Sequence, residues 1–306
     1  MSVPKIVVFD LDETLGYFSQ IGVMWSSLHP WTESDDLHPT HAEQMLFNDT
    51  LDLYPEFIRP DINNILRYVY DKKMSGDCDK MMIYTNNKRN SKWVHLIKSY
   101  FDYALGLKNR PYVFDQIIQA FKINGKIVEV SRTTKKKLHN DLIACTKMPL
   151  ETQICFLDDM VYAGMNHNNV YYINFEPYVH HLPFSEIVDR FSRNANNSPS
   201  IHHEVWSHGT EETFRLNTHH SILDQLGQGF SYKKKPFGEY EMDKIISRHM
   251  LEKIKMFFKL CDNGKCGRLE KIRVHPRPTK RRSKHKKNSM NTNKYTLKTR
   301  KRKKIW

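Results

Sequence analysis

The chain of 306 residues has few cysteines and lacks a long apolar segment. Its five cysteines are odd in number, scattered and never spaced as CxxC, which argues against a disulfide framework or a zinc ribbon. We therefore expect free or buried thiols and a reducing compartment. No stretch approaches about 18 consecutive apolar residues, and the apolar stretch near the N-terminus is too short for the core of a signal peptide. The sequence thus predicts an intracellular protein, cytoplasmic or nuclear, that makes no contact with a membrane.

Positive charge is in excess, but only at one end of the chain. Residues 268–306 hold 17 of the 48 Lys and Arg and one acid, Glu270, so residues 1–267 hold 31 basic and 33 acidic residues. The clusters PTKRRSKHKK and TRKRKK within this end are typical of nuclear-targeting or nucleic-acid-contacting segments. The alternative is a solvated tail that only aids solubility. In either case the composition predicts disorder for residues 267–306.

Short apolar runs alternate with amphipathic stretches over the first two hundred residues. The expected strands are 5–9, 81–84, 126–130, 154–157 and 170–175, and the expected helices begin after Pro60, at Asn90 or Ser91, at 117, at 135 and at 184. We expect a hairpin or flap at 17–25 and an irregular insertion at 29–52. This alternation predicts a three-layer α/β fold, with a small flap and insertion and no large cap domain, that binds its ligand at the carboxyl ends of the strands.

The polar run NANNSPS at 194–200 marks a boundary between segments. Three segments follow from it: an α/β domain at 1–195, a mainly helical extension at 196–266, and the basic disordered tail at 267–306. The helical assignment rests on Ile246, Met250, Ile254 and Phe257, whose spacing is that of an amphipathic helix expected to pack on the body.

Four carboxylates follow expected strands directly. The first strand leads into Asp10 and Asp12, and a later one leads into Asp158 and Asp159. If these strands are neighbours in a parallel sheet, the four side chains converge on one point. Like charges held close raise one another's pKa, and Mg²⁺ with oxygen ligands is the usual compensation.

Two further elements lie between these carboxylate pairs. Thr85 ends the second expected strand, and Lys135, Lys136 and Lys137 precede the strand that ends in the Asp pair. Thr85 has a simpler alternative role, in which its hydroxyl caps the next helix. The three lysines are consecutive and cannot all point inward.

The order of these elements resembles that of the haloacid-dehalogenase superfamily of aspartyl phosphotransferases. The segment FDLDETLG resembles the corresponding motif in one branch of this superfamily, the carboxy-terminal-domain phosphatases or NLI-interacting-factor-like protein phosphatases. The segments IYTNNK, TKMPLETQICFLDD and NVYYINFEPYVHHL look like the versions of this branch carried by giant DNA viruses. The resemblance covers about residues 3–193 and would place the protein in an infected host cell.

The resemblance implies a Mg²⁺-dependent phosphatase. Asp10 would be the nucleophile that forms an aspartyl-phosphate, and Asp12 the general acid and then base. The metal would be held by Asp10, the backbone carbonyl of Asp12, and one or both of Asp158 and Asp159.

Phosphoryl oxygens would be bound by the Thr85 hydroxyl, the backbone amide of Asn86 and one lysine. Lys137 is the favoured lysine, with Lys136 second. The branch implies phosphoserine or phosphothreonine in a protein as the substrate. Two alternatives remain open: a phosphatase for nucleic-acid ends, and a non-catalytic protein that binds nucleic acid through the tail at 268–306.

Overall fold

The computed structural model describes residues 3–28, 38–107, 111–207, 209–226, 232, 234–261 and 266–273. Residues Met1–Val274 form one compact unit. Residues 274–306, which make up most of the predicted tail, lie outside the described residues.

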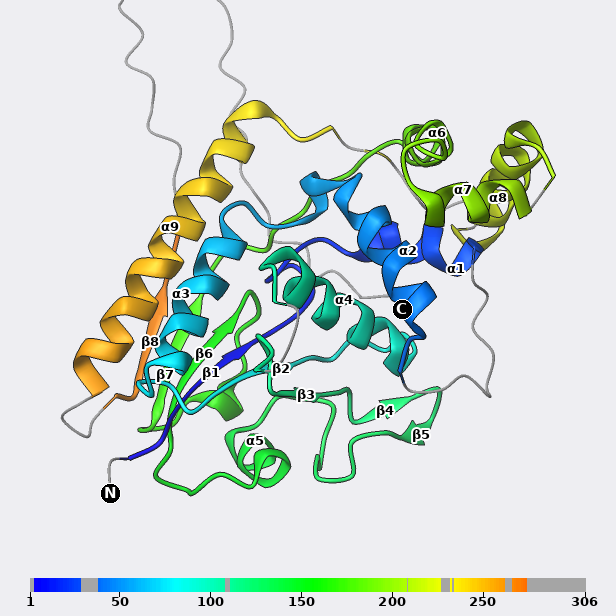
Figure 1. The fold of residues 1–306 in the computed structure, drawn as a ribbon. Helices are drawn as coiled ribbons and strands as arrows, with labels where there is room; N and C mark the ends of the chain where they lie inside the picture. Colours follow the sequence, from blue (N-terminus) through cyan, green and yellow to red (C-terminus); the bar gives the residue numbers. More distant parts are fainter. Residues whose placement is uncertain are drawn as a thin grey trace, which may run out of the picture. The chain divides into compact units, whose positions relative to one another are not determined.

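A parallel sheet forms the centre of this unit (Figure 1). Its six strands, in chain order, are β1 (Lys5–Phe9), β2 (Lys80–Tyr84), β3 (Gln116–Ile118), β6 (Gln153–Asp158), β7 (Val170–Asn174) and β8 (Arg268–Lys271). They lie in the order β3-β2-β1-β6-β7-β8, and every pair of neighbours is parallel. Strands β1 and β6, which carry the predicted carboxylates, are therefore adjacent, with Phe9 opposite Leu157.

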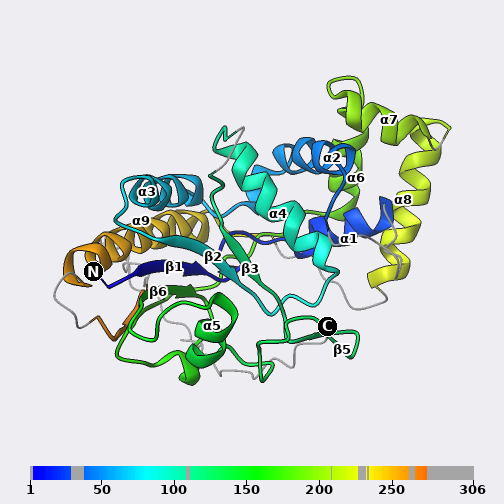
Figure 2. The ribbon, with the colours of Figure 1, turned by 60° about the horizontal axis from the view of Figure 1, so that its bottom comes forward.

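Helices cover both faces of the sheet and give three layers (Figure 2). The helices are α1 (Ser19–Leu28), α2 (His41–Asp52), α3 (Ile62–Met74), α4 (Ser91–Ala104), α5 (His139–Thr146), α6 (Phe184–Arg193), α7 (Pro199–Ser207), α8 (Glu211–Leu226) and α9 (Phe237–Leu260), with 3₁₀ turns η1 (Pro55–Phe57) and η2 (Ala163–Met165). Helices α3, α4 and α9 lie on one side of the sheet and α5 on the other. The α/β class and the three-layer arrangement predicted from the sequence are confirmed.

Strand β1 shows why its sequence forms the middle of the sheet. It is short, apolar and mostly β-branched, and its side chains alternate between two cores. Val7 and Phe9 belong to the larger core, whereas Ile6 and Val8 belong to the smaller core that includes residues of α5. After Lys5, burial on both faces leaves no polar position in the strand, so the first carboxylate comes where the strand ends.

Several elements differ from those predicted. Residues 17–25 were predicted to form a hairpin or flap, but most of them belong to helix α1. Part of the predicted irregular insertion is helix α2, and the predicted helix at 117–121 overlaps strand β3. The predicted strand at 126–130 is only β5 (Lys126–Ile127), which pairs with β4 (Lys122–Ile123) in an antiparallel hairpin. Helix α5 begins four residues later than predicted, at His139.

The two missed helices have different physical explanations. Seven of the ten residues of α1 are buried, six of them in the unbroken run 20–25, so no alternation of apolar and polar residues marks a helical period. Helix α2 carries a local signal, because Thr40 and Glu43 form a capping box. The backbone N–H of Glu43 donates to Thr40 Oγ1 at 3.2 Å, and the N–H of Thr40 donates to Glu43 Oε2 at 2.7 Å.

The C-terminal part of the described chain packs on the α/β layers. Helix α8 contacts α1 and α6, and α9 contacts α3 and β7. The prediction that the basic tail begins at residue 267 is wrong, because 268–271 form β8 at the edge of the sheet. Here backbone pairing with β7 and the burial of Ile272 outweigh a polar local composition.

The entry into β8 depends on a close approach and a covalent link. A Cβ at Gly267 would lie 2.5 Å from the Cα of Asn168, so no larger residue fits without a shift. Cys261 at the end of α9 is joined to Cys266 by a disulfide. The expectation of free thiols is therefore wrong for this pair, because two cysteines five residues apart meet where the chain reverses between α9 and β8. Cys78, Cys145 and Cys155 are free.

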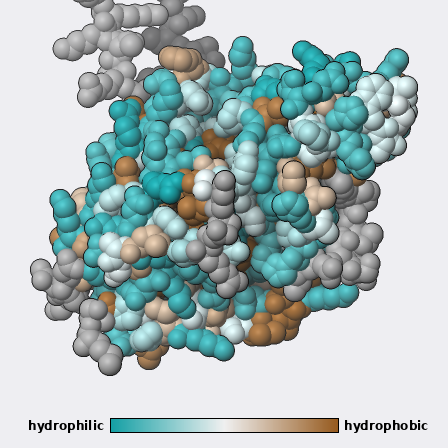
Figure 3. All heavy atoms as spheres, viewed as in Figure 1, coloured by the Kyte–Doolittle hydropathy of each residue, from teal (hydrophilic) through white to brown (hydrophobic). Residues whose placement is uncertain are grey.

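The surface agrees with this packing. The face drawn in Figure 3 is mainly hydrophilic, with small apolar patches, so the covering helices turn polar sides outward. Among the residues that the structure describes, no helix has both the length and the apolar character needed to span a membrane.

We expect Phe257→Ala to lower the free energy of unfolding by about 3–5 kcal/mol, because Phe257 is fully buried on α9 against Tyr171 of β7. Urea denaturation followed by fluorescence would measure the change. The neighbouring Met256 is 36% exposed, so Met256→Ala should cost less than about 1 kcal/mol. Equal losses in the two variants would show that α9 is not part of the core.

Candidate active site

Three carboxylates meet at the carboxyl end of the central strands. Asp10 follows β1 directly, and its backbone N–H donates to the carbonyl of Leu157 in β6 at 2.9 Å. Asp158 is the last residue of β6, and Asp159 follows it. One ligand atom from each of the three carboxylates lies within 4.8 Å of the others. The parallel pairing of β1 with β6 therefore places side chains almost 150 residues apart at one point.

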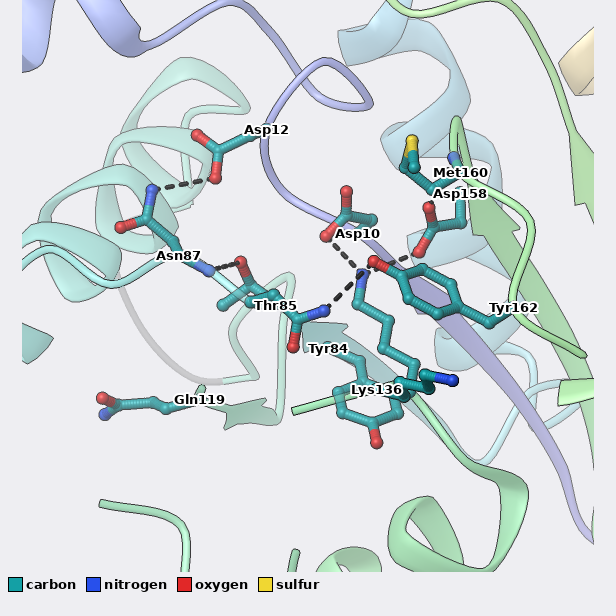
Figure 4. A network of polar contacts seen from close by, with 12 residues as sticks. Asp10, Asp12, Tyr84, Thr85, Asn87, Gln119, Lys136, Asp158, Met160 and Tyr162 are labelled. Atoms are coloured by element: carbon teal, nitrogen blue, oxygen red, sulfur yellow. Dashed lines mark hydrogen bonds and ion pairs between the residues drawn. The ribbon is translucent and has the colours of Figure 1, made fainter. Parts of the chain in front are cut away.

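A buried lysine lies between two of these carboxylates. Lys137 Nζ donates to Asp10 Oδ1 at 2.5 Å and to Asp158 Oδ2 at 2.7 Å. Its side chain is 1% exposed. Lys135 and Lys136 are exposed, and the side chain of Lys136 points away from the carboxylates in Figure 4. The loop before α5 thus brings into the centre the lysine that the sequence analysis favoured.

The charges of this centre shift one another's pKa values. Burial lowers the pKa of Lys137, but the attraction of Asp10 and Asp158 outweighs burial, so the ammonium stays charged. Burial raises the pKa of Asp158 to about 7, and the nearby Lys137 opposes that rise. Burial and repulsion by Asp10 and Asp158 raise the pKa of Asp159 to about 8. One ammonium does not compensate three carboxylates.

The unbalanced charge fits a divalent cation. Asp10, Asp158 and Asp159 offer only carboxylate oxygens, the donor type that Mg²⁺ prefers. Bound among them, a doubly charged cation would match the two negative charges that Lys137 leaves when all three carboxylates are ionised. The side chain of Asp12 is not part of this group, and the predicted contribution of its backbone carbonyl stays a prediction.

Asp12 lies on the loop after β1 and is held apart from the other carboxylates (Figure 4). Asn87 Nδ2 donates to Asp12 Oδ2 at 2.8 Å. Burial and, secondly, the negative charge of Asp10 raise the pKa of Asp12 to about 7, although the bond from Asn87 acts in the opposite direction. A carboxyl with this pKa can both donate and accept a proton near neutral pH.

A buried arginine holds the loop that carries Asp12. Glu13 has a positive φ of 61°. Arg59 binds the carbonyls of this loop: its Nε donates to the carbonyl of Thr14 and its Nη2 to that of Glu13, both at 2.7 Å. The guanidinium lies 4.9 Å from the centre of the Phe175 ring. Arg59 fixes the loop from one side of the site and was not foreseen from the sequence.

Thr85 lies buried at the end of β2. Its Oγ1 accepts the backbone N–H of Asn87 at 2.9 Å, which leaves the hydroxyl proton available to another acceptor. Helix α4 is capped by Asn90, whose side chain accepts the N–H of Lys92 at 2.7 Å. The alternative in which Thr85 caps α4 is therefore wrong.

Asn86 completes this edge of the site. Arg132 Nη2 donates to Asn86 Oδ1 at 2.7 Å, and Asn86 Nδ2 donates to Tyr162 Oη at 3.1 Å. Among the described residues its backbone N–H has no acceptor. Arg132 also donates to the carbonyl of Thr85 at 3.0 Å and to that of Lys136 at 3.2 Å. It thus joins the loop of Thr85 to the loop of Lys137.

The sequence analysis missed Asn87, Arg132 and Tyr162. Asn87 lies within the quoted segment IYTNNK, two residues after Thr85, and that proximity was a usable signal. Arg132 and Tyr162 lie in irregular segments with no motif around them, and only the folded chain shows their contacts.

Fold and site together define an α/β protein with a buried carboxylate–lysine centre at the carboxyl edge of a parallel sheet. No protein-family model, no curated protein and no solved structure matches the chain.

We expect Mg²⁺ to bind more tightly as the pH rises from 6 to 9. Asp158 and Asp159 have pKa values raised to about 7 and about 8, so their protons must leave before the carboxylates bind a cation. Binding should weaken by up to about tenfold per pH unit between these two values, where one proton is released, and by up to about a hundredfold per unit below both, where two are released. Calorimetry in buffers of different ionisation enthalpy measures both affinity and proton release. Asp77→Asn, at an exposed acid, should leave the profile unchanged, whereas equal affinity at both pH limits would contradict the expectation.

Proposed function

We propose that the protein is a Mg²⁺-dependent phosphatase of the haloacid-dehalogenase superfamily, in its carboxy-terminal-domain phosphatase-like branch. The observation that carries the proposal is the buried Asp10 carboxylate, bonded to Lys137 and grouped with Asp158 and Asp159. Asp12 lies two residues away with a pKa raised to about 7. A nucleophile, a proton donor and a cation site in one place are the parts that phosphoryl transfer through an aspartate requires.

The proposed reaction has two steps. In the first, a carboxylate oxygen of Asp10 forms a bond to phosphorus while the ester P–O bond breaks, and protonated Asp12 gives its proton to the leaving oxygen. In the second, Asp12 takes a proton from water, the water oxygen bonds to phosphorus, and the bond from phosphorus to Asp10 breaks to release phosphate. A pKa near 7 lets Asp12 serve both steps near neutral pH.

The other groups of the site would stabilise charge. The Lys137 ammonium lies where negative charge on the transferring phosphoryl group would develop. The Thr85 hydroxyl proton and the Asn86 N–H are donors for phosphoryl oxygens. Mg²⁺ held by the three carboxylates would neutralise the phosphate charge, so that an anionic nucleophile can approach it.

We infer the substrate class from the size of the elements that lie between the strands of the site. In the described part of the chain, the segment between β2 and β6 contains α4, β3, the β4–β5 hairpin and α5 rather than a further domain. A site without a large cover accommodates a phosphate on a macromolecule. We therefore propose phosphoserine or phosphothreonine in a protein as the substrate.

The basic segment supports a second candidate. Residues 268–306 carry 17 Lys and Arg against one acid, the composition of a segment that contacts phosphate backbones or the nuclear-import machinery. A phosphatase for nucleic-acid ends would use this segment to hold its substrate. A non-catalytic protein that binds nucleic acid is the third possibility.

Asp10→Asn should reduce phosphate release from an aryl phosphate to background, because the amide cannot act as the nucleophile. Phosphate release in Mg²⁺ measures this, and near-UV circular dichroism checks that the variant is folded. Asp49→Asn, at an acid outside the site that accepts bonds from Ser198 and Ser200, serves as a folded control. Undiminished turnover by Asp10→Asn would rule out the proposed nucleophile.

A substrate panel separates the three candidates. We expect kcat/KM for phosphoserine peptides to exceed that for 3′- or 5′-phosphorylated oligonucleotides by at least about tenfold, at a salt concentration that screens the basic segment. The reverse order would favour the nucleic-acid phosphatase. Tight oligonucleotide binding at low salt without turnover of any substrate would favour the non-catalytic protein.

A further inference from the structure

Asn174 fixes the backbone that carries two of the three carboxylates. It is the last residue of β7 and is fully buried. Its Nδ2 donates to the backbone carbonyls of both Asp158 and Asp159 at 2.9 Å. One amide group therefore sets the position of two consecutive residues whose side chains belong to the cation site.

Arg273 sets the orientation of that amide. Its Nη2 donates to Asn174 Oδ1 at 2.6 Å, and its Nε lies 3.5 Å from Glu176 Oε1. An arginine can only donate, so the carbonyl end of the amide must face Arg273 and the NH₂ end must face the two backbone carbonyls. Without this bond, a rotated amide would place its oxygen against those carbonyls.

Arg273 is held in place by the C-terminal strand. The backbone N–H of Ile272 donates to the carbonyl of Asn174 at 2.8 Å, and the Ile272 side chain is buried. Glu270 on β8 pairs with Lys253 of α9 at 2.9 Å. The Cys261–Cys266 disulfide links the end of α9 to the start of this segment. The last described residues of the chain thus end beside the site.

We propose that Arg273 and Asn174 are positioning residues for the cation-binding turn at Asp158 and Asp159, so that the C-terminal strand β8 is a working part of the site. The proposal deepens the proposed function, because it assigns the organisation of the same metal site to a segment outside the α/β motifs. Outer partners that orient metal-binding groups have effects of about 10- to 100-fold on affinity when removed. Arg273 acts through Asn174 and is one hydrogen bond further from the cation site. Its removal should therefore weaken Mg²⁺ affinity by a factor at the lower end of this range.

Arg273→Ala should weaken Mg²⁺ binding by about five- to tenfold, measured by calorimetry in the absence of substrate. In metal-free protein it should also speed hydrogen exchange at the N–H of Met160, which donates to Asp158 Oδ1 at 2.8 Å. Arg273→Lys keeps a cationic donor group, although without the planar fork of the guanidinium, and should recover part of both effects. The Arg273 side chain is 38% exposed, so the substitution leaves the core intact.

Arg268→Ala is the matched control. Arg268 is the first residue of β8, five residues before Arg273, is 52% exposed and pairs with Glu270 rather than Asn174. It should leave Mg²⁺ affinity and Met160 exchange within twofold of the unmodified chain. Unchanged exchange in Arg273→Ala, or equal changes in both variants, would overturn the proposal. Neither measurement needs turnover, so the result stands apart from the Asp10→Asn test of the phosphatase function.

Discussion

The contact between the Lys137 ammonium and the carboxylates of Asp10 and Asp158 is the interaction on which the site depends. Parallel pairing of β1 with β6 forces carboxylates together at a buried edge, where their mutual repulsion is weakly screened. A single cation from the loop before α5 offsets part of that repulsion and ties this loop to both strands. The charge left over is what makes the centre suited to a divalent cation.

Much of this centre could be foreseen, because its residues follow strands directly. A short apolar run that ends in a carboxylate is visible in the sequence, and parallel strands bring their carboxyl ends to one edge. The choice of Lys137 over its neighbours came from the family resemblance, since nothing local distinguishes three consecutive lysines. The assignment of the chain to that family stays a prediction, supported by the placement of Asp10, Asp12, Thr85 and Lys137.

The supporting contacts could not be foreseen. Arg59, Arg132 and Asn174 each donate to backbone carbonyls of segments distant in the sequence, and such bonds leave no periodic or motif signal. The same limit explains β8, whose polar composition is that of a tail, but whose backbone completes the sheet. A local sequence pattern predicts helices and strands that bury one apolar face against the core. An edge strand such as β8 forms because its backbone pairs with a neighbouring strand, and its own sequence shows no such pattern.

The position of β8 in the sheet also orders the events of folding. Strands pair in the order β3-β2-β1-β6-β7-β8, so β8, which comes last in the sequence among these six strands, joins an edge that the earlier ones can build before it is synthesised. Until residue 273 has emerged, Asn174 has no guanidinium to orient its amide. If Arg273 positions the turn as proposed, Asp158 and Asp159 would bind Mg²⁺ more weakly until β8 has paired with β7.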